Sequence, residues 1–205
     1  MKISTKPDIR YLKDMKEVIY DKQWLKTAPE SLELYYMYRG INPVQILPKA
    51  KIMAGKEKRG LRYDITIIPS RMLGQEFVKT KGHHHSDKYQ EIYIVLNGEA
   101  IFLFQKSKGK IVEDVLATKA EKGDVVIVPL NYGHITINPL NQELKIANWI
   151  SENCQNVYSI FKKMKGACYF YTKNGWIKNK NYKKIPELRF EKPLKSMPKN
   201  LDFLK

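Results

Sequence analysis

The chain has 205 residues, of which 43% are hydrophobic, and this is enough for one domain with a sizeable core. No run approaches the roughly 18 apolar residues that a membrane-spanning helix needs, and the first residues lack the apolar stretch of a signal peptide, so we expect a soluble, cytoplasmic protein. Two cysteines exclude a disulfide-rich scaffold, whereas a net charge of +16 fits a lysine-rich surface, attraction of an anionic small molecule, or nucleic-acid binding.

The first 60 residues are predicted to lie outside the main fold. Residues 10–39 read as helix or mixed structure, and we expect a few peripheral helices there. The stretch 40–60 has prolines and glycines among lysines, which predicts a loop or excursion. From Leu61 onward the pattern changes to short runs rich in β-branched and aromatic residues. These predicted strands are 62–68, 76–80, 91–96, 99–105, 112–117, 124–128, 135–138 and 144–149.

Many short strands at a spacing of roughly 8–12 residues predict an all-β barrel or sandwich rather than alternating strands and helices. Asn97-Gly98 and Asn174-Gly175 each predict a two-residue hairpin, because both central positions of a type I′ turn need positive φ. After Pro186 the basic tail is expected to lie along the surface or to reach a partner subunit. We therefore predict one domain over 1–205, with an N-terminal extension 1–60, a barrel core 61–150 and C-terminal strands, hairpin and tail 151–205.

All four histidines of the chain fall in two short segments, His83-His84-His85 and His134, and Glu91 follows the first of them. Side chains alternate across a strand, so His83 and His85 share a face while His84 points to the other. Three imidazoles and one carboxylate suit Fe²⁺, Mn²⁺, Ni²⁺ or Zn²⁺, and in an octahedral ion they leave two positions open. A solvated turn, and an ordinary core histidine at position 134, are the alternatives.

The spacing of these residues resembles the paired motifs of the cupin superfamily. The first motif is Gly82-His83-x-His85-x5-Glu91-x6-Gly98, and the second is Gly123-x5-Pro129-x4-His134-x3-Asn138. The resemblance implies a double-stranded β-helix barrel that holds one metal ion through His83, His85, Glu91 and His134. In the second motif Asn131 replaces the usual glycine, and asparagine also tolerates left-handed backbone.

Within that superfamily the chain is similar to the cupin-type glucose-6-phosphate isomerases. The likeness is carried by Leu61–Thr66, Gly74-x-Glu76-Phe77, Thr80–His85, Glu91-x-Tyr93, Tyr35–Tyr38 and Ala147–Trp149. It implies that Thr66, Thr80, Gly82 and Tyr158 lie near a sugar phosphate and that Tyr35 and Tyr93 line the pocket. Three positions depart from compact members of the family. Asn131 and Ile150 stand where those members have tyrosine, and Asn156 stands where they have histidine.

The resemblance implies an aldose–ketose isomerase that interconverts glucose 6-phosphate and fructose 6-phosphate in glycolysis and gluconeogenesis. A base removes the C2 proton, a cis-enediolate forms, and the proton returns at C1; Glu91 is the candidate base as well as a ligand, and Tyr93 assists ring opening or proton relay. A hydride shift is the alternative route. The expected ion is Fe²⁺ or Mn²⁺, with Ni²⁺ or Zn²⁺ as alternatives, and the expected assembly is a homodimer.

Other functions stay open from the sequence. A related metal cupin can act on mannose 6-phosphate or use O₂, and a non-catalytic cupin can bind a sugar phosphate. The lysines are spread along the chain without a zinc-finger spacing or an RNA-binding aromatic motif, so we expect neither a nucleic-acid nor a membrane partner.

Overall fold

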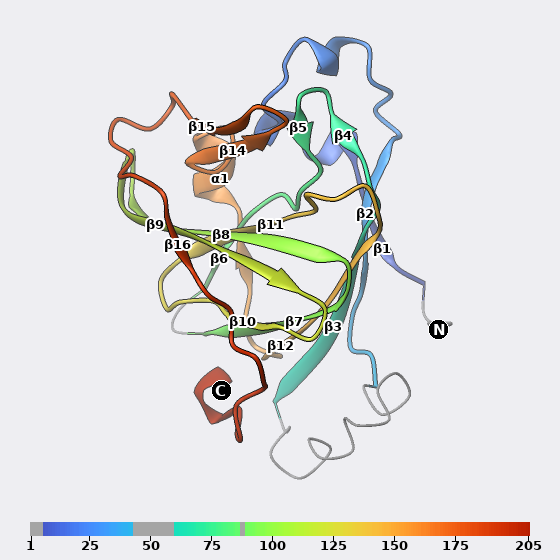
Figure 1. The fold of residues 1–205 in the computed structure, drawn as a ribbon, viewed down its shortest axis with the longest axis vertical. Coiled ribbons are helices and arrows are strands. Elements are labelled where there is room, and N and C mark those ends of the chain that lie inside the picture. The colour runs from blue at the N-terminus through green and yellow to red at the C-terminus, as the bar shows by residue number, and fades with distance from the viewer. Residues whose placement is uncertain (1–5, 43–59, 87–88) are drawn as a thin grey trace.

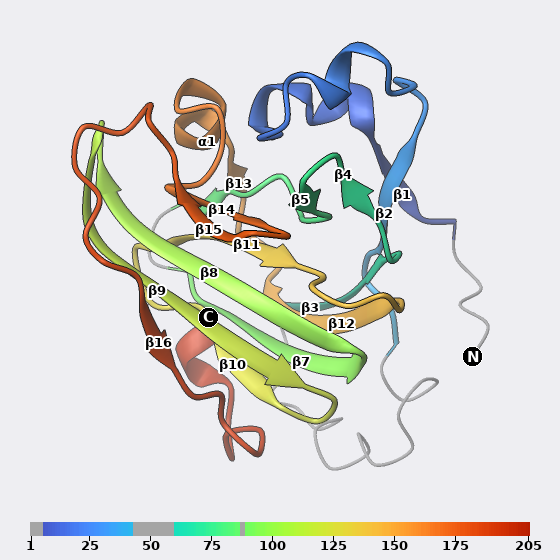
Figure 2. The same cartoon turned by 45° about the horizontal axis from the view of Figure 1, so that its top comes forward.

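Short, apolar, β-branched runs bury one face each, and in the structure they form two mainly antiparallel sheets that face each other (Figures 1 and 2). The computed structural model describes residues 6–42, 60–86 and 89–205. Most of the predicted excursion at 40–60 therefore lies outside the described residues. No helix in these described ranges is long and apolar enough to cross a membrane.

The first sheet has six strands and the second has four. In spatial order the first is β1 (Asp8–Tyr11), β2 (Glu33–Tyr38), β3 (Leu61–Ile68), β12 (Leu144–Ser151), β7 (Glu91–Asn97) and β10 (Val125–Ile127). The second is β11 (Gly133–Ile137), β8 (Glu99–Lys108), β9 (Ile111–Glu121) and β16 (Arg189–Glu191). The segment that contains β6 (His84–His85) runs beside β11, through bridges from Lys79 to Ile137 and from His83 to His134.

The order of these strands is that of a double-sheet jelly roll. The strands β3, β12, β7 and β10 form one wall, and the β6 segment, β11, β8 and β9 form the other. Apart from β8 and β9, which form a hairpin within one wall, strands of the two walls that follow each other in sequence lie in opposite walls, as in cupins. The predicted all-β fold, a cupin barrel with peripheral N-terminal helices, is confirmed; the helices are three short 3₁₀ turns, Leu12–Asp14, Lys16–Val18 and Trp24–Lys26.

The predicted hairpin at Asn97-Gly98 is wrong. The strands that flank it, β7 and β8, lie in different sheets, and the dipeptide carries the chain from one wall to the other. Gly98 has φ +80°, but among the described residues the only non-glycine residues with positive φ are Asn131 and Lys165, so Asn97 lacks the type I′ conformation. Instead the Asn97 side-chain amide donates to the carbonyl of Glu143 at 3.0 Å. The crossing between the walls is favoured because β7 pairs with β12 and β8 pairs with β9, each over more residues than a turn at Asn97-Gly98 would fix.

The second predicted hairpin is confirmed, but the type I′ turn predicted at Asn174-Gly175 is wrong, because Asn174 does not have a positive φ. Strand β14 (Tyr169–Thr172) pairs with β15 (Gly175–Lys178), and Thr172 lies opposite Gly175. The turn residues are Lys173 and Asn174, and Gly175 carries the positive φ of +97°. This hairpin packs over β4 (Met72–Leu73) and β5 (Glu76–Phe77) at one end of the barrel (Figure 2). Beside it lie β13 (Asn156–Val157), which pairs with β6, and the short helix α1 (Ser159–Lys163).

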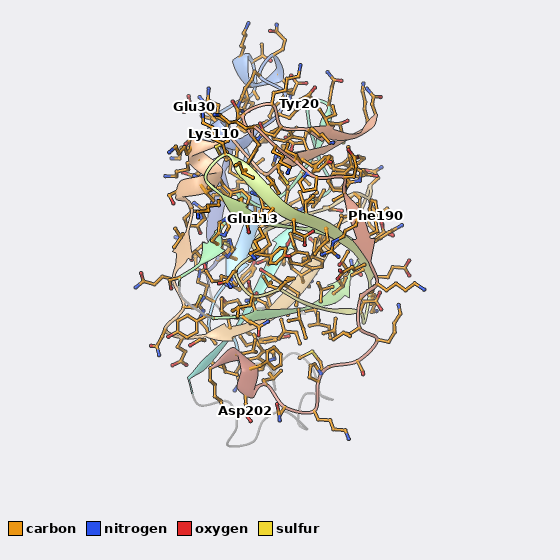
Figure 3. All side chains as sticks on the ribbon, turned by 90° about the vertical axis from the view of Figure 1, so that its left-hand side faces the viewer. Tyr20, Glu30, Lys110, Glu113, Phe190 and Asp202 are labelled. Carbon is orange, nitrogen blue, oxygen red and sulfur yellow. The ribbon has the colours of Figure 1, made fainter. Side chains whose placement is uncertain are left out.

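Residues 188–205, which we call the C-terminal strap, follow the chain's own barrel. Strand β16 adds in parallel to β9, Leu194 bridges to Val125, and a 3₁₀ turn at Asp202–Leu204 ends the strap. Leu201 and Leu204 are buried against the outer face of the first sheet, in a cluster with Leu61, Tyr63 and Ile65. Figure 3 shows Phe190 of β16 and Asp202 at opposite ends of this strap. The tail thus covers the edge of the second sheet and part of the outer face of the first.

Candidate metal and substrate site

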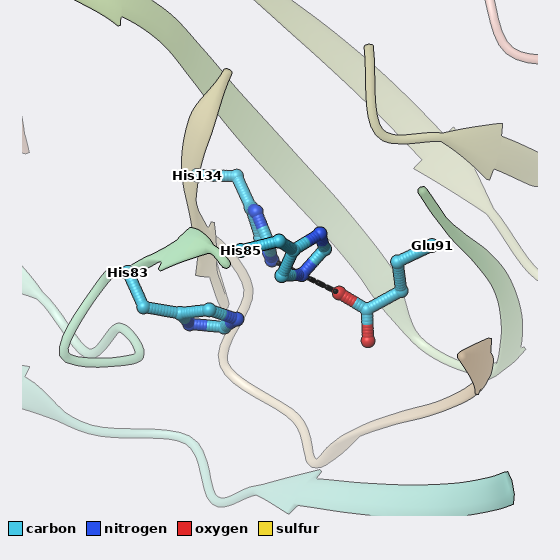
Figure 4. Close-up of side chains that lie close together, drawn as sticks. All are labelled: His83, His85, Glu91 and His134. Atoms are coloured by element: carbon cyan, nitrogen blue, oxygen red, sulfur yellow. Dashed lines mark hydrogen bonds and ion pairs between the residues drawn. The ribbon is translucent and has the colours of Figure 1, made fainter. Parts of the chain in front are cut away.

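His83, His85, Glu91 and His134 converge inside the barrel. Their ligand atoms all lie within 4.8 Å of one another, and the side chains point toward one another (Figure 4). The Nε2 atoms of His85 and His134 are 3.1 Å and 3.2 Å from the same carboxylate oxygen of Glu91. Glu91 and His134 are only 3% and 2% exposed. A cluster of this composition and burial could hold a metal ion.

Backbone pairing positions the four side chains. His83 and His134 form an antiparallel bridge in which each amide donates to the other's carbonyl, at 3.2 Å and 2.9 Å. The Nδ1 atom of His85 is 3.1 Å from the carbonyl of Tyr89, and donation there leaves Nε2 as the free ligand atom. His84 lies outside the cluster, with its ring 5.5 Å from that of Phe161. Alternation along the segment therefore separates His84 from its two neighbours.

The electrostatics of the cluster suit a divalent ion. Burial alone would raise the pKa of Glu91, but hydrogen bonds and charge interactions with His134 and His85 outweigh it and hold the pKa well below the usual range. Burial lowers the pKa of His83 and of His134. Burial would also lower the pKa of His85, but its hydrogen bond to Glu91 raises it. Metal ligation needs ionised carboxylate and neutral imidazole, and three of the four groups already favour those states.

A pocket of about 600 Å³, including its open mouth, adjoins the cluster, with His83 and Glu91 in its wall. Its lining combines polar, charged and aromatic side chains, which suits a polar ligand that can enter through the open mouth. All six residues that the sequence assigned to a substrate pocket line it: Tyr35, Thr66, Thr80, Gly82, Tyr93 and Tyr158. The barrel thus brings together two groups of predicted residues that are up to 123 positions apart in the chain, from Tyr35 to Tyr158.

Six polar pocket residues were missed by sequence reasoning: Arg39, Arg62, Asp64, Lys81, Thr136 and Asn148. Asp64 is buried and accepts hydrogen bonds from Arg62 Nε at 2.9 Å, Arg39 Nη1 at 3.2 Å and the amide of residue 40 at 3.0 Å. The signal was present in part. Arg62, Asp64 and Thr66 alternate along one predicted strand, so a pocket-facing Thr66 implies that the other two face the pocket as well.

Asp64 and Tyr93 belong to one row across the first sheet. Asp64 lies opposite Asn148 on β12, and Asn148 lies opposite Tyr93 on β7. The Tyr93 hydroxyl is 3.2 Å from His134 Nε2. Burial, and then the charge of Glu91, raise the pKa of Tyr93 well above its ordinary value. Tyr93 therefore keeps its proton at neutral pH and can donate it in a hydrogen bond within the pocket.

The three departures from the compact isomerases fall in different places. Ile150 and Asn156 line the main pocket, and the Asn156 amide is 3.4 Å from the Tyr158 hydroxyl. Asn131 instead borders a small cavity beside His84 and His85, and it has φ +67°, the left-handed conformation expected for it. The change from tyrosine to asparagine at position 131 thus lies outside the main pocket.

A family model described as glucose-6-phosphate isomerase (GPI) matches residues 9–187 of the chain. A glucose-6-phosphate isomerase of Thermococcus litoralis is 30% identical over 138 residues, which cover 66% of this chain and 64% of that protein. One of Pyrococcus abyssi is 32% identical over 133 residues, which cover 63% and 62%. The match thus spans less than two thirds of the length of these curated relatives.

Two solved structures have lower similarity. Oxalate decarboxylase from Bacillus subtilis at pH 4.6 aligns with 64% of this chain and 29% of its own, at 17% identity and a TM-score of 0.42. Vicilin from Corylus avellana aligns with 62% and 32%, at 14% identity and a TM-score of 0.43.

Proposed function

Because this chain belongs to the glucose-6-phosphate isomerase family, we propose that it is an aldose–ketose isomerase that interconverts glucose 6-phosphate and fructose 6-phosphate. The observation that carries the proposal is the pocket that joins the His83, His85, Glu91 and His134 cluster to Thr66, Thr80, Gly82 and Tyr158. One wall offers ligands for a cation, and the other offers donors for a phosphate. Glycolysis and gluconeogenesis as the setting, and a homodimer as the assembly, stay predictions.

In this proposal the three imidazoles and the Glu91 carboxylate hold one divalent ion, with Fe²⁺ or Mn²⁺ as the expected metal. Oxygen and nitrogen donors without a thiolate suit these ions. When bound, such an ion supplies a Lewis acid that stabilises negative charge on substrate oxygen. The depressed pKa of Glu91 favours its role as a ligand, because a carboxylate of low pKa is a weak base.

Proton transfer is assigned to Glu91 and Tyr93. Glu91 is the pocket carboxylate beside the three histidines, so it is the candidate acceptor of the C2 proton. Its lowered pKa opposes this second role, and a hydride shift, which needs no base, is the alternative route. The Tyr93 hydroxyl, 3.2 Å from His134 Nε2, holds a proton that it can donate to a sugar oxygen during ring opening. Asn148 lies between Tyr93 and Asp64 in the same row of side chains. In this proposal its side-chain amide faces the sugar.

Neutral donors are proposed to hold the phosphate. The Thr80 hydroxyl oxygen accepts the amide of Thr136 at 2.9 Å, so its own proton is available to a ligand. Gly82 has φ +85°, and a Cβ there would lie 2.6 Å from Ile135 and 2.7 Å from Phe161. The absence of a side chain keeps the backbone of Gly82 at the pocket wall, where its amide can approach an anion.

A coupled assay tests the proposal. Fructose 6-phosphate is supplied to protein loaded in turn with Fe²⁺, Mn²⁺, Ni²⁺ and Zn²⁺, and the glucose 6-phosphate formed is oxidised by a dehydrogenase. Turnover is expected, and its absence with every metal refutes the proposal. Mannose 6-phosphate as the sole rapid substrate, or O₂ consumption, assigns the site to another reaction.

Substitution of one ligand tests the metal assignment. We expect His134→Ala to lose both bound metal and turnover, since it removes one of four donors. His84→Gln is the matched control, because His84 is a neighbouring histidine outside the cluster. Metal content by elemental analysis should fall in the first variant and stay in the second. Full metal content in His134→Ala would contradict the assignment.

A further inference from the structure

Positive charge gathers on the pocket wall next to His83. The ring of Tyr158 is 5.8 Å from the ring of His83, and the Lys81 ammonium is 6.0 Å from the centre of the Tyr158 ring. Lys81 lines the pocket and is 7% exposed. One of its three N–H donors goes to the backbone carbonyl of Asp14. Two donors of a nearly buried ammonium thus remain beside the pocket.

Arg10 lies behind the same wall. It is on β1, directly opposite Tyr35 of β2, and the Tyr35 hydroxyl accepts the amide of Lys81 at 3.3 Å. Its guanidinium lies close to the hydroxyls of Tyr35 and Tyr158. The Nε atom of Arg10 is buried and has no hydrogen-bond partner in the part of the chain that the structure describes. The described residues that line the pocket do not include Arg10, so its positive charge acts on the pocket from behind the wall.

The acidic groups near these two cations are few. Asp14 and Glu17 are the carboxylates whose charge acts on Lys81, and Asp14 also accepts the amide of Tyr11 at 3.0 Å. Lys162 of α1 adds a third positive charge near Lys81. Like charges that are held together around two hydroxyls favour an anion between them. A phosphate dianion carries the charge and the acceptor oxygens that such a site needs.

We propose that Lys81 binds the phosphate of the substrate directly, and that Arg10 acts on it from behind as a positioning residue through the Tyr35 and Tyr158 hydroxyls. Strand β1 then supplies the charge that selects a phosphorylated sugar over a free one. This rests on the proposed function in taking the sugar phosphate as the ligand, and it adds two cations to the neutral donors.

Calorimetric titration of the metal-loaded protein with inorganic phosphate tests the site without turnover. We expect wild type to bind phosphate and Lys81→Gln to bind it about tenfold to a hundredfold more weakly, as for a lost hydrogen bond to a charged group. Arg10→Gln should weaken it by about tenfold, and Arg10→Lys should recover part of the loss by restoring the charge. The matched control is Lys13→Gln, which removes one positive charge from an exposed position three residues along the chain.

Three outcomes overturn the inference: no phosphate binding by wild type, unchanged binding in both Lys81→Gln and Arg10→Gln, or an equal loss in Lys13→Gln. Kinetics give a second readout. The KM for fructose 6-phosphate should rise in Arg10→Gln while kcat changes little, and a fall in kcat alone contradicts the assignment. If Arg10→Gln does not fold, Arg10→Lys and Lys81→Gln carry the test. Wild type that binds phosphate in this way but does not isomerise upholds the site and refutes the proposed function.

Discussion

Gly82→Ala should be among the most damaging single-methyl changes in this barrel, because it combines two costs. The residue has φ +85°, where an L side chain costs about 1–2 kcal/mol. The added Cβ would lie 2.6 Å from Ile135 Cγ2 and 2.7 Å from Phe161 Cδ1, and overpacking of this kind costs about 1–3 kcal/mol. The expected loss in the free energy of unfolding is therefore about 2–5 kcal/mol.

Gly123→Ala separates the two costs. Gly123 has a similar φ of +94°, but a Cβ there meets no atom within 4 Å, so we expect a loss of only about 1–2 kcal/mol. Urea unfolding followed by circular dichroism gives both values, and the difference should be about 1–3 kcal/mol at equal m-values. Equal destabilisation of the two variants would refute the packing argument around Gly82.

Three further predictions concern other parts of the molecule. Lys79→Met should lower the free energy of unfolding by about 3–5 kcal/mol in urea titrations, because it leaves the buried carboxylate of Glu76 without its ion pair. The double variant Lys79→Met with Glu76→Gln should recover much of this loss. The pKa of Asp114 is lowered to about 2, chiefly by its hydrogen bond from Arg189. The ionised carboxylate therefore stabilises the fold fully above its ordinary pKa of 3.8, and this contribution is lost as the pH falls toward 2. Asp114→Asn should lose less stability than wild type between pH 4 and pH 2. Tyr93→Phe should lower kcat by about 100-fold or more with metal content unchanged, and an unaltered kcat excludes proton relay by that hydroxyl.

Part of the metal cluster could be predicted from the sequence because two of its histidines are close together in the chain. His83 and His85 alternate within three residues, and a face shared by two histidines follows from strand geometry alone. His134 was grouped with them because all four histidines fall in two short segments, and the resemblance to a known spacing supported that grouping, since His134 meets His83 by barrel closure across 51 positions. Roles for these residues in catalysis and binding stay predictions.

The wrong hairpin has a physical explanation. Asn97-Gly98 has the local preference for a tight turn, but β7 pairs with β12 over Lys145–Ile150 and β8 pairs with β9 along its whole length. These two ladders, one long-range and one a local hairpin, outweigh the turn preference of two residues. Arg10 was missed for a similar reason, because only the pairing of β1 with β2 brings it behind the pocket.

The buried ion pair of Lys79 and Glu76 lies outside what composition or periodicity can predict. Its ammonium also donates to the carbonyl of Val18 at 2.9 Å and lies 4.6 Å from the centre of the Phe170 ring. Glu76 accepts the amide of Tyr20 at 2.8 Å. These contacts join the N-terminal segment to the C-terminal hairpin, and no local pattern relates such distant parts of the chain.

The C-terminal strap makes the order of synthesis matter for solubility. All four metal-ligand candidates have been translated by residue 134, yet β9 keeps an uncovered edge over Leu116–Thr118 until Arg189–Glu191 leave the ribosome. An uncovered edge strand is a template for pairing with strands of other molecules. A nascent or proteolysed chain that ends before the strap thus contains all four candidate metal ligands, but the edge of its second sheet is uncovered. We expect such a chain to self-associate rather than to lose the site.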